Sequence, residues 1–233
     1  MVKDKIVEIC CGSIEDCTVA QKFPVDRIEL NSAIELGGLT PSLGTLIEAK
    51  KATTLPICCM VRPRTAGFVY TEAQFQSMLY DAELLLKHGA DGIVFGFLNE
   101  DTTIDATRTN QMAKLIKSYG KEVIFHKAFD KTPDKIAACE TLIECQVDRI
   151  LTSGGENYPH IEKGFELLKS LIEKYNNQIT ILVGGGVRAH NVHNILESTN
   201  CTQIHMTAKE MANDCGEYAA VSEHNLAEIL SNF

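Results

Sequence analysis

The repeated alternation of two kinds of segment is the feature that most constrains how this chain can fold. Short runs rich in β-branched residues are followed by longer segments of helical period, and this alternation repeats eight times. The predicted strands span residues 5–10, 26–30, 56–62, 91–96, 121–126, 148–152, 179–183 and 203–206. The predicted helices span residues 13–22, 42–53, 71–88, 104–119, 133–145, 160–175, 188–198 and 217–230. Short connections between such units make the sheet parallel, and eight uninterrupted units predict a closed (β/α)8 TIM barrel.

Local signals at helix ends support these boundaries. Thr71 and Gln74 have the spacing of a capping box at the start of the third predicted helix. Thr132 followed by Pro133 fits an N-cap before a proline in the first helical turn. Gly89 stands where a left-handed residue ends a helix.

Composition and charge exclude several classes of protein. The chain has 233 residues with no linker or low-complexity tract, so residues 1–233 are predicted to form one domain. A net charge of -9 without a run of Lys and Arg argues against a nucleic acid partner. No segment has signal-peptide or membrane-spanning length, so we expect a cytoplasmic protein with no membrane partner. Nine cysteines without a Cys-x-x-Cys pair favour reduced thiols over disulfides or structural zinc.

The two faces of each strand differ, because the face under the helices must be apolar and the other face points to the barrel axis. In the first strand Val7 and Ile9 are expected to face the helices, which turns Glu8 and Cys10 inward. The parity of strand 148–152 is ambiguous. On the other strands the rule adds the inward side chains Glu29, Asn31, Cys58, Met60, Arg62, His126, His205 and Thr207.

These inward side chains are too polar for an inert core, and two interpretations stay open. Glu29 and Arg62 lie on neighbouring strands and could form a structural ion pair, because buried charges need partners. Alternatively, Glu8, Glu29, Arg62 and His126 are the catalytic groups of an enzyme, since carboxylates and imidazole carry out general acid and base catalysis. Asp130 could orient His126 or cap the helix that follows.

A glycine run after the seventh strand stands where many barrels bind phosphate through backbone amides. The flanking loops add a serine, a further glycine and one cation, although the glycines could equally be simple turn residues. Arg64, in the loop after the third strand, is a further candidate for ligand contact. The candidate anion-binding residues are Arg64, Ser153, Gly154, Gly184, Gly185, Gly186 and Lys209. The run does not match Gly-x-Gly-x-x-Gly, so no nucleotide cofactor is expected.

Six segments together resemble the CutC copper homeostasis family. They are DRIEL at 26–30, GGLTPS at 37–42, MVRPR at 60–64, GADG at 89–92, FHKAFD at 125–130 and ILTSG at 150–154. The similarity runs from about residue 6 to about residue 209 and includes the spacing between motifs. The resemblance implies a barrel in the cytosol, a homodimer or higher homo-oligomer, and a role in copper tolerance with Cu(I) bound through cysteine in some members.

Two positions decide how the copper chemistry of that family would carry over. The family's cysteine at the end of the first strand corresponds to Cys10, whereas its second cysteine falls on Asn31. Copper(I) prefers soft thiolates, so a site in this chain would recruit Cys11, Cys58, a methionine or a histidine. Gly67 stands where the family loop usually carries an acidic residue.

The sequence therefore leads to two main functional hypotheses. The first is a copper homeostasis protein that binds Cu(I) at Cys10 in the mouth of the barrel. The second is an enzyme that acts on a small molecule bearing phosphate or carboxylate. An interaction scaffold is a third, minor possibility.

Overall fold

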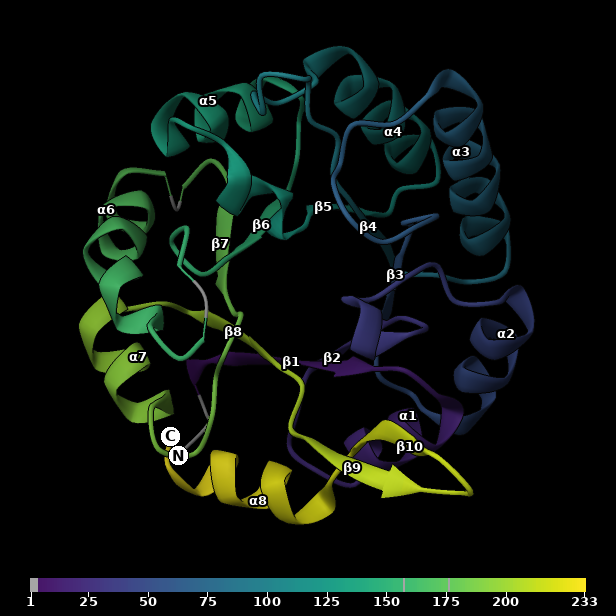
Figure 1. Cartoon of the computed structure of the whole chain (residues 1–233), viewed down its shortest axis with the longest axis vertical. Coiled ribbons are helices and arrows are strands. Elements are labelled where there is room, and N and C mark those ends of the chain that lie inside the picture. Colours follow the sequence, from purple (N-terminus) through teal and green to yellow (C-terminus); the bar gives the residue numbers. More distant parts are fainter. Residues whose placement is uncertain (1–3, 157, 176) are drawn as a thin grey trace.

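Eight parallel strands form a closed barrel in the computed structural model, which describes residues 4–156, 158–175 and 177–233 (Figure 1). Each strand pairs with the next in sequence, and β8 pairs with β1 to close the sheet. The strands are β1 (Ile6–Cys11), β2 (Arg27–Leu30), β3 (Ile57–Met60), β4 (Gly92–Phe95), β5 (Glu122–Phe125), β6 (Arg149–Thr152), β7 (Thr180–Val183) and β8 (Gln203–Met206). The predicted (β/α)8 TIM barrel is confirmed, and each observed strand overlaps its prediction.

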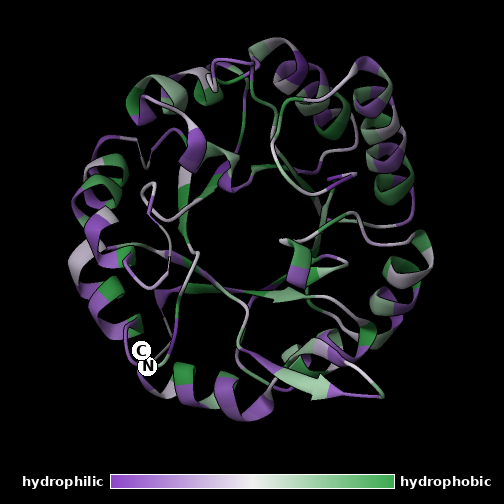
Figure 2. Cartoon of the chain, viewed as in Figure 1, coloured by the Kyte–Doolittle hydropathy of each residue, from purple (hydrophilic) through white to green (hydrophobic). Residues whose placement is uncertain are grey.

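A ring of α-helices surrounds the barrel (Figure 1). These helices are α1 (Ile14–Gln21), α2 (Leu43–Ala52), α3 (Glu72–Lys87), α4 (Ala106–Ser118), α5 (Lys135–Glu144), α6 (Phe165–Tyr175), α7 (Val192–Thr199) and α8 (Glu223–Ser231). They mix hydrophobic and hydrophilic residues (Figure 2), as expected of helices with one face on a core. No helix in the described ranges is long and apolar enough to cross a membrane.

The main core lies between the strands and the helices. Outward strand residues such as Val7, Ile9 and Ile28 are fully buried in it. A second, small cluster of Cys58, Met60, Val94 and Ile124 fills part of the barrel interior. The predicted alternation of strand faces is therefore confirmed.

The caps of α3 and α5 test the helix boundaries that were predicted from local sequence signals. Thr71 and Gln74 form the predicted capping box at the start of α3, and Gly89 after its end has a φ of 97°. The predicted cap at Thr132 is wrong, because α5 begins two residues later with Asp134 as its N-cap. The Asp134 carboxylate accepts hydrogen bonds from two backbone N–H groups of α5, a contact that favours a later start.

A β-hairpin precedes the last helix and was not predicted. Its strands β9 (Lys209–Asn213) and β10 (Glu217–Val221) pair antiparallel, whereas residues 217–221 were expected to begin the final helix. That expectation is wrong because long-range contacts favour the extended conformation. The N–H of Ala219 donates to Glu35 and the N–H of Val221 donates to the buried Asp16.

The start of α6 and of α7 also lies later than predicted. Residues 161–164 form a short 3-10 helix (η4, Ile161–Gly164), and α6 follows from Phe165. Two further 3-10 segments, η2 (Ile34–Leu36) and η3 (Lys127–Lys131), follow β2 and β5. Both 3-10 segments bring residues to the C-terminal end of the barrel, where Ile34 and Lys127 line a cavity.

Candidate functional site

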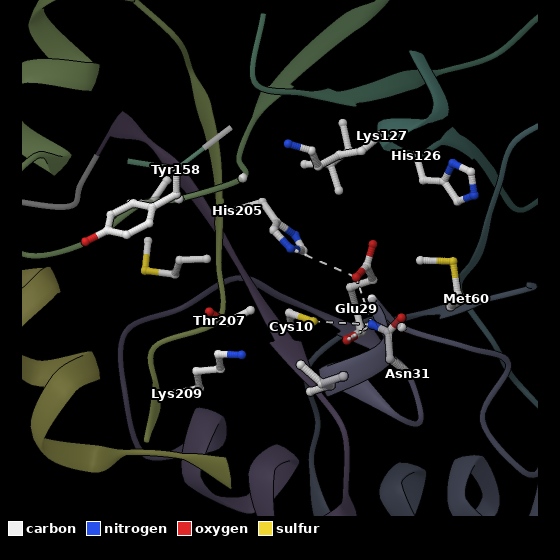
Figure 3. Close-up of a pocket in the computed structure, with 18 of the residues that line it drawn as sticks. Cys10, Glu29, Asn31, Met60, His126, Lys127, Tyr158, His205, Thr207 and Lys209 are labelled. Atoms are coloured by element: carbon white, nitrogen blue, oxygen red, sulfur yellow. Dashed lines mark hydrogen bonds and ion pairs between the residues drawn. The ribbon is translucent and has the colours of Figure 1, made fainter. Parts of the chain in front are cut away.

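A cavity of about 430 Å³ opens at the C-terminal ends of the strands (Figure 3). Its wall includes Cys10 on β1, Glu29 on β2, Met60 on β3 and His205 on β8. Its volume lies in the range of small-ligand pockets, and its position is the usual one for barrel active sites. We call it the mouth cavity.

The inward side chains predicted from strand parity divide between two levels of the barrel. Asn31, Arg62, His126 and Thr207 join the wall of the mouth cavity. Glu8 lies one level lower, where it contacts charged residues instead of the cavity. The ambiguous strand is also resolved, because Ile150 packs in the outer core while Arg149 and Leu151 on either side point inward.

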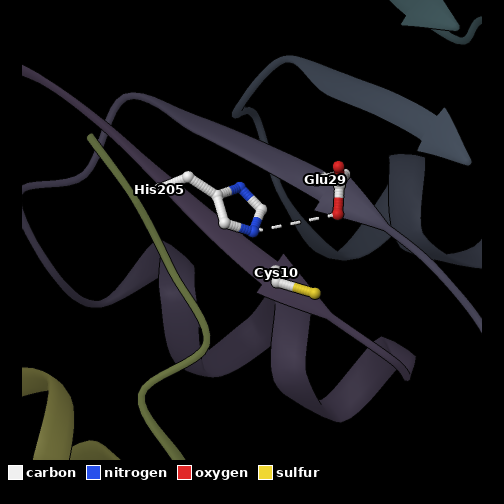
Figure 4. A group of neighbouring side chains, drawn as sticks. All are labelled: Cys10, Glu29 and His205. Carbon is white, nitrogen blue, oxygen red and sulfur yellow. Dashed lines mark ion pairs between the residues drawn. The ribbon is translucent and has the colours of Figure 1, made fainter. Parts of the chain in front are cut away.

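A thiol, a carboxylate and an imidazole meet at the floor of the mouth cavity (Figure 4). The potential ligand atoms of Cys10, Glu29 and His205 all lie within 4.8 Å of one another, and all three residues are buried. We call these residues the mouth cluster. Nε2 of His205 is 4.0 Å from Oε2 of Glu29. A set of sulfur, oxygen and nitrogen donors at this spacing can hold a metal ion or act on a polar ligand.

Asn31 forms hydrogen bonds to two members of the mouth cluster. Its Nδ2 donates to Oε2 of Glu29 at 2.8 Å and approaches Sγ of Cys10 at 3.4 Å. The carboxylate partner fixes which end of the amide is the donor. Asn31 therefore supplies an N–H to the sulfur rather than a second sulfur ligand.

Burial dominates the ionisation of the mouth cluster. It raises the pKa of the Cys10 thiol, and the nearby Glu29 carboxylate raises it further. Burial also raises the pKa of Glu29, although His205 partly opposes this. For His205 burial would lower the pKa, but the charge of Glu29 and the hydrogen bond to Glu8 outweigh it and raise the pKa. The cluster therefore favours protonated groups more than the same side chains would in water.

A network of paired charges lies below the mouth cluster. Glu8 forms ion pairs with Arg27 and, at 3.7 Å, with Arg149, while Arg149 also contacts Glu122 at 2.9 Å. Burial alone would raise the pKa of Glu8, but the hydrogen bond with His205 and the two arginines together lower it. We call Glu8, Arg27, Glu122 and Arg149 the lower ion network.

The lower ion network reaches the mouth cluster through one contact. Oε1 of Glu8 lies 2.8 Å from Nδ1 of His205. This bond places Nε2 on the side of Glu29 (Figure 4). Glu8 thereby sets the orientation of the His205 ring, as carboxylates do behind metal-binding histidines.

Arg62 does not form the expected ion pair with Glu29. Its guanidinium donates to the carbonyl oxygens of Gly37, Gly38 and Ala66, at 3.0 to 3.1 Å. The structural pair is therefore wrong, because the long side chain reaches the loop after β2 rather than the strand beside it. Its charge instead acts on His126.

His126 is held in one tautomer by its own chain. Its Nδ1 accepts the backbone N–H of Ala128 at 3.1 Å, so Nε2 carries the hydrogen of the neutral ring. Burial and the neighbouring Arg62 lower the pKa of His126 to about 3. Asp130 does not contact this ring. It accepts hydrogen bonds from Thr152 and Ser153 instead, so neither predicted role of Asp130 is observed.

The predicted anion-binding residues separate into two groups. Gly185, Gly186 and Lys209 line the mouth cavity, whereas Ser153, Gly154, Gly184 and Arg64 do not. Ser153 and Gly154 form a turn fixed by Asp130 and Thr152, and Gly184 packs against Leu151 and His205. Arg64 donates to the carbonyl oxygens of Thr65, Gly67 and Val69 in its own loop.

Sequence reasoning missed two cations of the cavity wall, Lys127 and Arg188. Lys127 directly follows His126, and only Val187 separates Arg188 from the glycine run. Their place after strand ends was a usable signal, but strand parity says nothing about loop residues. Tyr158 also joins the wall and lies under the guanidinium of Arg188, 5.1 Å from ring centroid to Cζ.

Other cysteines lie too far from the mouth cluster to complete it. Cys11 faces the outer core, and Cys58 belongs to the lower interior beside Arg149. Within the described residues, Cys10, Glu29 and His205 are the group of potential metal ligands that the structure brings together. The histidine was among the alternatives considered from sequence, and the carboxylate was not.

Comparisons with known proteins agree with this architecture. The sequence profile of the CutC family matches residues 5–210. A CutC family protein of Treponema denticola is 45% identical over 207 residues, which cover 89% of this chain and 82% of the relative. The human copper homeostasis protein cutC homolog is 37% identical over 204 residues, covering 88% and 73% respectively. The crystal structure of a protein named CutC from Streptococcus agalactiae superposes with a TM-score of 0.81 at 32% identity, covering 86% of this chain and 97% of that one.

Proposed function

Because the chain belongs to the CutC family, we propose that it serves in copper homeostasis and binds a copper(I) ion at the mouth of the barrel. Cys10 is the proposed thiolate ligand and His205, through Nε2, the proposed second ligand. The observation that carries this proposal is the convergence of Cys10, Glu29 and His205 within 4.8 Å.

The donor types support copper over a hard metal ion. Copper(I) accepts thiolate, thioether and imidazole ligands, and Met60 adds a thioether to the same cavity wall. Binding requires loss of the Cys10 proton, and the Asn31 N–H beside the sulfur stabilises the resulting charge. Asn31 thus assists the thiolate at the position where the family resemblance expects a second cysteine.

The enzyme hypothesis receives less support from the same residues. Glu8 and Arg62 are engaged by fixed partners, Glu8 by Arg27 and Arg62 by the carbonyl oxygens of Gly37 and Gly38. His126, with a pKa of about 3, stays neutral near pH 7 and is a poor general base. Of the four candidate groups, Glu29 is the carboxylate that lines the cavity, and its pKa is raised by burial.

We also propose that the protein acts in the cytosol as a homodimer or higher homo-oligomer, as its family resemblance implies. A reducing compartment suits eight buried free thiols. Fractionation of cells and light scattering of the purified chain test these two points, and a monomer at micromolar concentration would contradict the second.

Titration of the reduced protein with copper(I) against a competing chelator tests the metal site. Wild type is expected to bind one ion, and Cys10→Ser to lose at least about a hundredfold in affinity, since even outer partners of metal ligands contribute 10–100-fold. Cys215→Ser is the matched control, because Cys215 is exposed and lies at the tip of the β9–β10 hairpin. Equal affinity of Cys10→Ser and wild type would remove the proposed site.

A gain-of-function variant sharpens the same test. Asn31→Cys places a thiol where the Asn31 amide now approaches Cys10. We expect copper(I) affinity to rise by at least about tenfold, because a second soft ligand replaces a neutral amide. No gain would mean that copper binds away from Cys10 and Asn31.

A further inference from the structure

The charges around the mouth cavity oppose those of the whole protein. The chain has a net charge of -9, yet the cavity wall carries Arg62, Lys127, Arg188 and Lys209 against one carboxylate, Glu29. Figure 3 shows Lys127 and Lys209 on opposite sides of the opening. A cluster of cations in an acidic protein attracts a ligand of negative charge.

Among the described residues, three of these four cations have no carboxylate within 4.0 Å. Arg62 is engaged by loop carbonyls, and Nζ of Lys127 lies 3.1 Å from Asp130. No carboxylate of the described ranges lies within 4.0 Å of the charged atoms of Arg188 or Lys209. Nη1 of Arg188 donates to the carbonyl oxygen of Val187, but the charges of Arg188 and Lys209 have no carboxylate to pair with at the rim of the cavity.

Backbone donors lie beside the two rim cations. Gly185 and Gly186 have φ angles of 98° and 136°, which favour glycine, and both line the cavity. On either side, the N–H of Gly184 donates to Thr152 and that of Arg188 donates to Asn191. Across the part of the chain described by the structure, no acceptor contacts the N–H groups of residues 185–187. Successive free amides of this kind form an anion-binding concavity.

The floor of the cavity offers an unused acceptor. Glu29 is only 3% exposed, and its Oε1 has no hydrogen-bond partner among the described residues. Figure 4 shows this oxygen turned away from His205. A buried polar atom left without a partner costs about 1–3 kcal/mol, so a ligand hydroxyl that donates to it would recover that energy.

We infer that the mouth cavity binds a small molecule that carries an oxyanion, phosphate or carboxylate, on a hydroxylated skeleton. The oxyanion lies against Arg188, Lys209 and the free amides of residues 185–187, and a hydroxyl group donates to Glu29. The cationic part of this site does not include the proposed copper ligands Cys10 and His205. The site therefore does not depend on copper. It also explains why a cavity with a metal-binding floor has a rim that would repel a free cation.

Calorimetry with four matched probes tests the inference: inorganic phosphate, glycerol 3-phosphate, glycerate and glycerol. Glycerol 3-phosphate or glycerate is expected to bind at least about tenfold more tightly than inorganic phosphate, because the hydroxyl groups add contacts at Glu29. Glycerol is expected not to bind measurably. The stronger of glycerol 3-phosphate and glycerate identifies phosphate or carboxylate as the preferred group.

Paired double variants test the rim. Arg188→Ala with Lys209→Ala should weaken binding of the better probe by at least about tenfold. Lys114→Ala with Lys169→Ala removes the same charge from helices α4 and α6 and should leave binding unchanged. Equal losses in both pairs, or no binding of either anionic probe to wild type, would overturn the inference.

Two cross-tests separate this inference from the copper proposal. Cys10→Ser should bind the better probe as wild type does, and the Arg188 and Lys209 double variant should keep its copper(I) affinity. Probe binding without copper binding would support the anion site alone. Copper binding without probe binding would support the copper proposal and reject the anion site.

Discussion

The two ends of the barrel interior differ in how their charged side chains are paired. At the lower end Glu8, Arg27 and Arg149 face one another as ion pairs. At the mouth the nearest cation to the carboxylate of Glu29 is His205, at 4.0 Å, and among the described residues Lys209 forms no ion pair within 4.0 Å. Paired buried charges hold a scaffold, whereas unpaired ones cost stability and indicate a group reserved for a ligand.

The largest expected effect on the free energy of unfolding comes from a substitution at the lower end of the barrel. Glu8→Gln leaves the buried Arg27 and Arg149 without their shared carboxylate, and loss of one partner of a buried pair costs about 3–5 kcal/mol. Urea unfolding at pH 7 measures the change. Glu122→Gln is the control, because its side chain is 46% exposed and its contribution is screened. If Glu8→Gln costs less than about 1 kcal/mol, the lower ion network does not hold the scaffold.

A medium effect concerns pH and His126. Its folded pKa, about 3, lies below the ordinary value of 6.5, so the unfolded chain binds the proton more readily. The stabilising contribution of neutral His126 is therefore fully present above pH 6.5 and is lost as pH falls toward 3. Between pH 7 and pH 5, wild type should lose about 2 kcal/mol more than His126→Gln.

Urea titrations at pH 7, 6 and 5 measure this difference, and subtraction of the two proteins removes the effects of other groups. The variant His224→Gln, at an exposed position, provides the control for the loss of an imidazole elsewhere in the chain. Parallel curves for wild type and His126→Gln would show that the His126 ring accepts a proton in the folded protein.

The smallest expected effect belongs to the mouth. Glu29→Gln removes a buried carboxylate that has no strong cation partner, so stability should change by less than about 1 kcal/mol or rise. The same urea assay measures it beside Glu8→Gln, which carries the identical chemical change. A cost equal to that of Glu8→Gln would erase the contrast between the two ends.

The sequence predicted those features that depend on strand periodicity. Outward Val7 and Ile9 turned Glu8 and Cys10 to the interior, and the structure confirms this placement. The floor of the cavity could therefore be predicted before any coordinates. The copper and anion roles of these residues remain proposals.

Features that depend on long side chains and loops could not be predicted. Arg62 sits on the expected face, but its side chain extends to the carbonyl of Gly37 rather than to Glu29. Residues 217–221 have no strong helical or extended period of their own, and distant partners such as Asp16 decide their conformation. Arg188 lies in a loop, where neither periodicity nor parity fixes the direction of a side chain.

The β9–β10 hairpin lies outside the barrel sheet but contributes Lys209 to the rim of the mouth cavity. The hairpin begins with Lys209 at the cavity rim, close to residue 210, where the match to the family profile ends. It contacts the barrel through hydrogen bonds such as that from the N–H of Ala219 to Glu35. Lys209 is the hairpin residue that lines the cavity among the described residues, while Cys10 and His205 lie on barrel strands β1 and β8. The charge at the cavity rim can therefore be changed at Lys209 without touching a barrel strand.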